Sequence, residues 1–260
     1  MIADSKNIEK ANQSSDPSKE VVIDISHLKI SFGSQEVLKD ISLKLFAKEN
    51  LVVLGKSGTG KSVLIKCIVR LLNSDSGTIN VYGKNVPDLN RVELGVLRQK
   101  IGFLFQSGAL YDSMTVKENL EFPLIRLKKE MDAKQREEKV LEVLENVGLA
   151  DAIHKMPSEL SGGMRKRISL ARTIVIDPGI ILYDEPTTGL DPVTSDEIST
   201  LIKDIQNKYK TASIIITHDI NCALSTANRI IMLDSGLIYK EGSVSDFQTS
   251  DDPVVQAFFK

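Results

Sequence analysis

A glycine-rich octapeptide at residues 55–62 restricts the fold of this chain more than any other feature. It follows a wholly apolar run at 51–54 and precedes an apolar stretch at 63–72, which predicts a strand, a loop and a helix in that order. Glycines allow successive N–H groups of such a loop to point inward at a phosphate, and the helix N-terminus adds positive charge. All eight residues are candidates for phosphate binding: Gly55, Lys56, Ser57, Gly58, Thr59, Gly60, Lys61 and Ser62.

Two side chains in this octapeptide and two beyond it suggest chemistry at the phosphates. Lys61 can reach the β- and γ-phosphates of a nucleoside triphosphate, and the Ser62 hydroxyl can ligate Mg²⁺. Asp184 and Glu185 directly follow the apolar run 180–183, at the sheet edge where open α/β sheets bind ligands. We therefore expect Asp184 to be a second metal partner and Glu185 to orient or deprotonate a water. The alternatives are a chance glycine-rich turn and an acidic surface pair; the flanking strand and helix argue against the turn.

Composition sets limits on the other function classes. The chain has 260 residues, 42% of them hydrophobic, enough for one large domain or two small ones with a full core. Its 33 Lys and Arg nearly balance 35 Asp and Glu, aromatic residues make up 5% and Trp is absent, so nothing indicates nucleic acid. Cys67 and Cys222 match no zinc or redox spacing, and we expect buried thiols in a reducing compartment.

The N-terminal segment, residues 1–20, is polar and has no apolar core, which predicts a flexible lead-in rather than a secretory signal. No apolar run approaches the roughly 18 residues needed to span a bilayer. We therefore expect a cytosolic chain, with any membrane part of its machinery on another polypeptide.

The remaining patterning predicts an α/β core with two additions. Short apolar pieces between 21 and 45, separated by a turn at Gly33-Ser34, indicate an N-terminal antiparallel β region. Apolar runs at 101–105, 180–183 and 213–217 predict strands that helices cover on both faces. Residues 107–164 lack long apolar strands and predict a helical insertion. The expected organisation is a flexible segment (1–20), an ATPase-like domain (21–240) and a C-terminal tail (241–260).

Local signals place several boundaries. Asp191 followed by Pro192 predicts a capped helix, and Asn90 with Glu93 resembles a capping box. A second such box is expected at Asp132 with Gln135, before a helix at about 134–147. A glycine turn at 234–236 between apolar runs predicts a late hairpin.

Motifs in the second half of the chain resemble those of the ABC ATPases. Residues 160–164, Leu-Ser-Gly-Gly-Met, resemble the signature motif, and Thr188-Gly189-Leu190-Asp191 resembles the D-loop. Gln106 resembles the Q-loop glutamine, His218 the switch histidine, and Phe32 the aromatic residue beneath adenine. With the octapeptide, the resemblance extends from about residue 21 to 239 and implies a P-loop NTPase core that binds and hydrolyses ATP with Mg²⁺.

The same resemblance implies roles and a dimer. Gln106 would contact Mg²⁺ and the water, His218 the γ-phosphate, and Phe32 the adenine ring. Ser161, Gly162 and Gly163 precede a predicted helix and form a second anion site. In the family, two subunits pack head to tail, so that each signature closes on the other subunit's nucleotide. Met164 departs from the usual Gln and cannot donate the hydrogen bonds of an amide.

Further segments resemble the Mla-type phospholipid-transport ATPases that work with MCE proteins. They are residues 106–111, 114–116, 119–124, 160–167, 182–192 and 252–259. This resemblance implies a membrane permease partner, an MCE protein and a place on the cytoplasmic face of the inner membrane. It also implies that the permease docks on an apolar patch, which could instead be ordinary core: Ala109, Leu110, Tyr111 and Met114. The alternatives are a small-solute importer subunit of amino-acid type, or a soluble ABC protein acting on nucleic acid or the ribosome.

Overall fold

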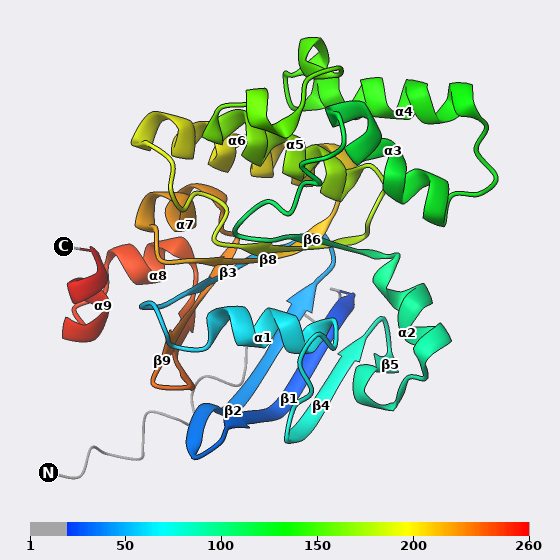
Figure 1. The fold of residues 1–260 in the computed structure, drawn as a ribbon. Helices are drawn as coiled ribbons and strands as arrows, with labels where there is room; N and C mark the ends of the chain where they lie inside the picture. The colour runs from blue at the N-terminus through cyan, green and yellow to red at the C-terminus, as the bar shows by residue number, and fades with distance from the viewer. Residues whose placement is uncertain (1–19, 260) are drawn as a thin grey trace, which may run out of the picture.

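The computed structural model describes residues 20–259, in which a long, curled sheet carries helices on both faces (Figure 1). The segment predicted to be flexible, 1–20, therefore lies outside the described residues except for Glu20. The sheet has ten strands in the order β5-β4-β1-β2-β10-β9-β3-β8-β7-β6.

One end of the sheet contains the strands with runs that are apolar on both faces. These are β3 (Asn50–Leu54), β8 (Ala212–Thr217) and β7 (Ile180–Asp184), in which every residue is buried, with β6 (Ile101–Leu104) at the edge. They pair in parallel, so their carboxyl ends share one edge. Helix α1 (Lys61–Ile68) covers one face, and α5 (Gly162–Ile174), α6 (Pro192–Tyr209) and α7 (Ile220–Thr226) lie on the other (Figure 1). Burial on both faces explains why these runs do not alternate.

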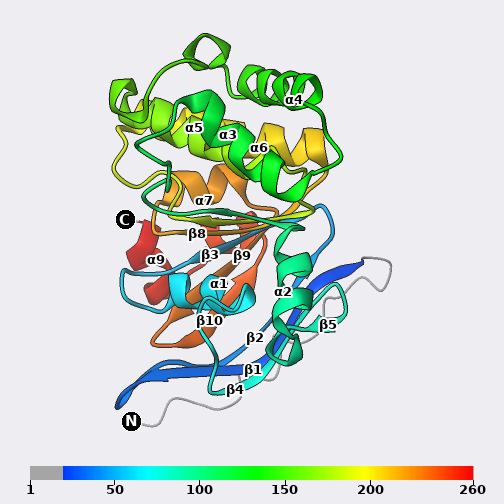
Figure 2. The ribbon, with the colours of Figure 1, turned by 45° about the vertical axis from the view of Figure 1, so that its right-hand side comes forward.

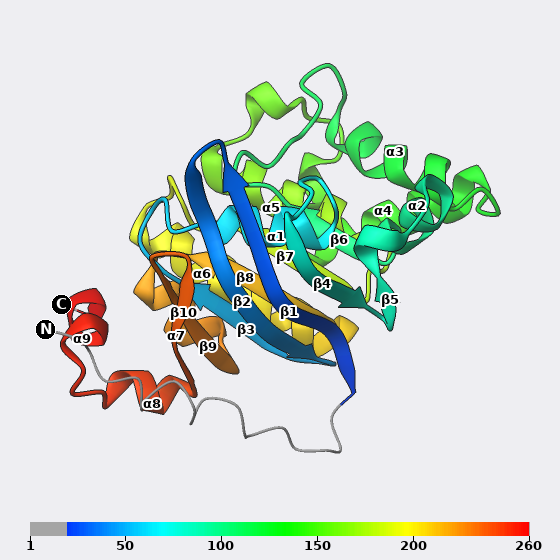
Figure 3. The same ribbon diagram turned by 90° about the horizontal axis from the view of Figure 1, so that it is seen from below.

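The predicted antiparallel region is present. It consists of β1 (Val21–Phe32), β2 (Gln35–Phe46), β4 (Ser76–Val81) and β5 (Lys84–Asn85). The turn between β1 and β2 has Gly33 at φ 60°, where glycine is favoured. A single parallel pair, Leu237 with Asp40, joins β10 to β2. In Figure 2, β1 and β2 lie below β3 and β8, and in Figure 3, which is seen from below, they lie in front of these strands.

The helical insertion follows β6. It contains α3 (Val116–Leu127), α4 (Ala133–Asn146) and the short 3₁₀ turns η2 (Ala150–Ala152) and η3 (Pro157–Glu159) before α5 begins. The capping box at Asp132 and Gln135 is confirmed, and Thr115 with Glu118 forms another at α3. These elements lie beside α5 and α6, far from the antiparallel strands (Figure 2).

The other predicted local signals are also confirmed. Asn90 and Glu93 form a capping box on α2 (Arg91–Arg98), which follows the 3₁₀ turn η1 (Val86–Asp88), and Asp191 caps α6. The late hairpin is β9 (Arg229–Asp234) with β10 (Leu237–Gly242).

The C-terminal part of the chain contains α8 (Val244–Gln248) and α9 (Pro253–Phe259). Phe247 and Val255 are fully or almost fully buried, and Tyr239 donates a hydrogen bond to Asp252, so this stretch packs on the core. Cys67 and Cys222 are buried as predicted, and burial raises the pKa of each thiol to about 11. Among residues 20–259 no helix has the length and apolar character needed to cross a bilayer.

Candidate active site

The glycine-rich loop closes around its own lysine. The loop leaves β3 and enters α1 through Gly58 and Gly60, whose φ values of 84° and 96° suit residues without a Cβ. The Lys61 ammonium donates to the main-chain carbonyls of Gly55, at 2.6 Å, and Lys56, at 3.0 Å. The first carbonyls of the loop therefore hold the lysine side chain in place.

A cavity of about 250 Å³ lies against this loop. It brings together side chains from four separate strand ends, as parallel strands with a shared carboxyl edge require. The lining residues are Val37, Ser57, Gly58, Gly60, Lys61, Ser62, Val63, Gln106, Glu185 and His218. Thus five residues of the predicted loop face one space together with Gln106, Glu185 and His218.

Two acidic side chains reach this loop from the end of β7. The Ser62 hydroxyl donates to Oδ1 of Asp184 at 2.6 Å, and Asp184 is only 4% exposed. Oε1 of Glu185 lies 3.5 Å from the Lys61 ammonium. Burial lowers the pKa of Lys61, and the negative charges of Glu185 and Asp184 oppose that shift. The site therefore places a partly desolvated cation between the loop and two carboxyl groups.

Glu185 is held in an unusual backbone conformation. Its φ is 51°, a left-handed value that is uncommon outside glycine, and its N–H donates to the Ile216 carbonyl at 2.9 Å. Its Oε2 lies 2.8 Å from Nδ1 of His218 and accepts a hydrogen bond from the Thr188 hydroxyl at 3.1 Å. Contacts with three residues therefore fix the carboxylate toward the cavity.

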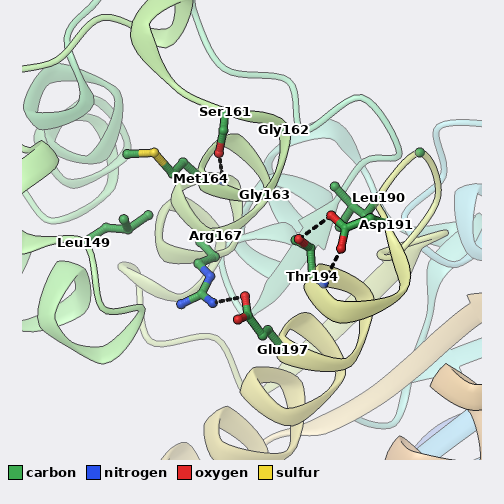
Figure 4. A pocket seen from close by; sticks show the side chains of 11 residues that line it. Leu149, Ser161, Gly162, Gly163, Met164, Arg167, Leu190, Asp191, Thr194 and Glu197 are labelled. Carbon is green, nitrogen blue, oxygen red and sulfur yellow. Dashed lines mark hydrogen bonds and ion pairs between the residues drawn. The ribbon is translucent and has the colours of Figure 1, made fainter.

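The signature residues lie elsewhere in the chain. Ser161, Gly162 and Gly163 line a different cavity of about 490 Å³, which has no lining residue in common with the first (Figure 4). Ser161 caps α5 by accepting from the Met164 N–H at 3.2 Å. A Cβ on Gly163 would lie 2.6 Å from Cγ2 of Thr194, so glycine allows α5 and α6 to approach closely. One chain thus contains two half-sites that it does not join.

The second cavity is partly apolar. Met164 lines it with Leu149 and Leu190, and an ion pair of 2.6 Å between Arg167 and Glu197 lies at another part of its wall (Figure 4). Leu149, Leu190 and Met164 are half-buried against the core. In place of an amide, this chain therefore presents a thioether among other apolar side chains.

Besides the three signature residues, four of the predicted nucleotide-binding residues do not line the first cavity: Phe32, Gly55, Lys56 and Thr59. Gly55 and Lys56 act through the carbonyls that hold Lys61, and the Thr59 hydroxyl donates to the Lys56 carbonyl at 2.9 Å. Phe32 ends β1 with 49% of its surface exposed. Its role beneath adenine stays a prediction.

Sequence reasoning gave no role to two residues that belong to this region. Val37, on β2, lines the cavity, and nothing in the sequence distinguishes it from other strand residues. Lys166 is 6% exposed and donates to the Gln106 carbonyl at 2.7 Å. It lies in a run of three basic residues, where the sequence does not separate a buried lysine from a solvated one.

Known proteins share both the sequence and this fold. A family described as ABC transporter matches residues 38–188. The probable ribonucleotide transport ATP-binding protein mkl of Mycobacterium leprae is 41% identical over 238 residues, covering 92% of this chain and 68% of that protein.

Two further relatives have names of a different kind. Protein TRIGALACTOSYLDIACYLGLYCEROL 3, chloroplastic, of Arabidopsis thaliana is 38% identical, covering 92% of this chain and 73% of its own length. The methionine import ATP-binding protein MetN of Rhizobium johnstonii is 39% identical, covering 89% of this chain and 64% of its own length. The chain therefore spans about two thirds of several of its relatives.

A solved structure has the same architecture. The dimeric, post-hydrolysis structure of an ATP-binding cassette bound to ADP and Pi is 31% identical, with a TM-score of 0.78, covering 85% of this chain and 98% of that one. The predicted fold class, an α/β P-loop NTPase core with an antiparallel region and a helical insertion, is thus confirmed. The chain belongs to the ABC transporter family and is one of its ATP-hydrolysing, nucleotide-binding subunits.

Proposed function

We propose that this chain powers phospholipid transport by hydrolysing ATP between two copies of itself. The observation that carries the hydrolytic part is the convergence of Lys61, Ser62, Glu185 and His218 on one cavity at the carboxyl edge of the sheet. Phosphoryl transfer depends mainly on positioning and charge stabilisation, and this cavity offers both.

Each group has a distinct task in this proposal. The N–H groups of the loop and the Lys61 ammonium bind the β- and γ-phosphates. Glu185, held by Thr188 and His218, orients or deprotonates the attacking water. His218 also contacts the γ-phosphate, and Gln106, which follows β6 at the same edge of the sheet, contacts the water.

The residues present fit a magnesium ion that is bound together with the nucleotide. Mg²⁺ prefers oxygen ligands and usually keeps several waters beside one or two carboxylates and substrate phosphates. The paired oxygens of Ser62 and Asp184 offer such a set, and Gln106 can add its amide oxygen. Within residues 20–259 there is no group of three or more His, Cys, Asp or Glu that could hold a metal ion. When bound, the ion supplies neutralisation of phosphate charge.

A second copy of the chain completes the site. Ser161, Gly162 and Gly163 line a cavity of their own, so in one chain they are separate from the loop at Lys61. A two-fold dimer brings the signature of each copy to the loop of the other. The dimeric arrangement of the similar cassette with ADP and Pi supports this assembly.

The proposal that the cargo is phospholipid rests on the resemblance of this chain to other proteins. The segments that resemble Mla-type ATPases support it, and so does the similarity to a plant protein named after a galactolipid. The partners in this proposal are a membrane permease and an MCE protein, with the chain at the cytoplasmic face of the inner membrane. The permease docks beside Tyr111, which is 42% exposed, and Ala109, which is also exposed.

An importer of small solutes is the second candidate, favoured by the similarity to the methionine import protein. Purification of the tagged chain in mild detergent, followed by mass spectrometry of bound proteins and lipids, separates the candidates. A polytopic membrane protein with bound phospholipid is the expected result. A permease with a free amino acid would favour the importer. Ribosomes or DNA without a polytopic protein would overturn both.

A further inference from the structure

Lys166 is a buried cation without an assigned task. It lies on α5, the helix that Ser161 caps, and only 6% of its surface is exposed. Its ammonium donates to the main-chain carbonyl of Gln106 at 2.7 Å and contacts that of Glu185 at 3.5 Å. One side chain therefore joins the signature helix to the main chain of two residues that face the phosphate cavity.

Charge neutralisation does not explain this position. The ion pairs of residues 20–259 include none that involves Lys166, whose contacts are with carbonyl oxygens. Burial lowers the pKa of the ammonium, and the charges of Asp184 and Glu185 oppose that shift. A buried ammonium group needs hydrogen-bond acceptors to replace water. The carbonyls of Gln106 and Glu185 therefore determine where the Lys166 side chain points.

The side of α5 that carries Lys166 also contacts residues 108 and 109, in the segment that follows β6. A Cβ on Gly108 would lie 2.5 Å from the Ser169 hydroxyl, and the Arg172 guanidinium donates to the Ala109 carbonyl at 2.8 Å. Residues 166, 169 and 172 recur every three positions, so they lie along one side of the helix. The segment 106–109 therefore contacts α5 at Gln106 and Ala109 and approaches it closely at Gly108.

We propose that Lys166 is a positioning residue that transmits the placement of α5 to Gln106 and Glu185. When a second copy binds at Ser161–Gly163, it fixes the N-terminus of α5. Lys166 then holds the main chain of both cavity residues in the arrangement that hydrolysis needs. This inference rests on the roles proposed for Gln106 and Glu185, and it adds a connection between the two half-sites of each chain.

The test compares Lys166→Met, which removes the donor, with Lys166→Arg, which keeps a cation and several N–H groups. Misplaced catalytic groups cost about 10- to 100-fold in rate, so we expect that loss in kcat for Lys166→Met. The Kd for ATP should stay within about twofold, because the loop and Lys61 are unaffected. Lys166→Arg should restore most of the rate. Amide exchange at residues 106–109 should increase in Lys166→Met alone.

Lys139→Met is the matched control. Lys139 also joins the helical insertion to the rest of the chain, through Asp177 at 2.8 Å, and it pairs with Glu142 of its own helix at 3.0 Å. It contacts neither Gln106 nor Glu185. It should lower the melting temperature without changing kcat. If Lys166→Met does not fold, Lys166→Gln replaces it and should show the same loss in milder form, because its shorter side chain keeps an NH₂ donor.

Two results would overturn the inference. One is an unchanged kcat with unchanged exchange at 106–109 in the Met or Gln variant; the other is Lys166→Arg being as impaired as Lys166→Met. An error in the roles proposed for the active-site residues would give a different experimental result. If Glu185→Gln hydrolysed ATP at the wild-type rate, the role of Glu185 would be wrong, while exchange at 106–109 would still decide the Lys166 contact.

Discussion

Nδ1 of His218 lies 2.8 Å from Oε2 of Glu185, the oxygen that also accepts the Thr188 hydroxyl. The other oxygen, Oε1, faces the Lys61 ammonium at 3.5 Å. Both carboxylate oxygens thus have defined partners within the chain. The carboxylate is oriented in advance, which lowers the reorganisation that hydrolysis requires.

Glu185→Gln should retain ATP binding and nearly abolish turnover. The amide has almost the same shape, but it loses the charge and cannot accept at both ends, so water activation is lost. We expect kcat to fall at least about 100-fold, with the Kd for ATP changed only severalfold. A phosphate-release assay measures kcat, and nucleotide-binding fluorescence measures the Kd for ATP. Glu138→Gln, on the exposed face of α4, is the control and should behave as wild type.

Two glycines of the phosphate loop should differ in their tolerance of alanine. Gly58→Ala meets no atom within 4 Å, so only the left-handed backbone costs energy, about 1–2 kcal/mol. Gly60→Ala adds a contact of 2.6 Å with Cδ2 of Leu38, and overpacking costs about 1–3 kcal/mol more. Gly60→Ala should therefore have the lower melting temperature. Equal melting temperatures would contradict the loop packing described here.

Sequence patterns predicted the features of this fold that depend on short stretches. The strand before Gly55, the capping boxes at Asn90 and Asp132, and the hairpin at residues 234–236 each follow from a local rule, and each is present. The apolar pieces between 21 and 45 predicted antiparallel strands but not how long these strands are. They belong to two strands of 12 residues, with bulges that interrupt the alternation.

Features that depend on contacts between residues far apart in the sequence could not be predicted from a local pattern. The strand β4 pairs with β1, and its exposed polar residues do not resemble a strand run. Lys166 is buried because the Gln106 carbonyl lies beside α5, which only the folded chain shows. The separation of Ser161 from Lys61 into two cavities likewise follows from tertiary packing, although the motifs predicted a partner for each.

Ser62→Ala should weaken Mg²⁺ binding at this site, so that hydrolysis needs a higher Mg²⁺ concentration. It removes one oxygen from the proposed metal set and leaves Oδ1 of Asp184 without its donor. The Mg²⁺ concentration for half-maximal hydrolysis should rise about tenfold, equivalent to about 1.4 kcal/mol of binding. Titration of Mg²⁺ after chelation by EDTA measures it. An unchanged titration curve would remove Ser62 from the metal site, and Ser225→Ala, on α7, is the control.

Ser161→Phe should leave nucleotide binding by the single chain intact and prevent dimer closure. The loop at Lys61 shares no lining residue with the Ser161 cavity, so its affinity for ATP should be unchanged. The ring would occupy the space in which the partner's nucleotide is expected. Light scattering with ATP, in the Glu185→Gln background, reports the dimer. Thr78→Phe, at an exposed position of β4, should still dimerise; dimers of Ser161→Phe would contradict the composite site.

Asn119→Ala should disorder the segment that carries the proposed permease surface. Asn119 is fully buried; its Oδ1 accepts from the Tyr111 N–H at 2.8 Å. Its Nδ2 donates to the carbonyls of Tyr111, Met114 and Thr115 at 3.0–3.1 Å. Alanine leaves these groups without a partner, at a cost of about 1–3 kcal/mol for each buried group that water does not reach.

The melting temperature of Asn119→Ala should therefore fall by about 5–10 °C, and less permease should copurify, while ATP binding at the distant loop persists. Asn221→Ala, at an exposed position of α7, is the control for both measurements. Copurification at the wild-type level, together with a lowered melting temperature, would show that the permease does not use this segment. Because the same amide fixes Tyr111 and Met114, the variant tests the surface as a whole rather than any one of its side chains.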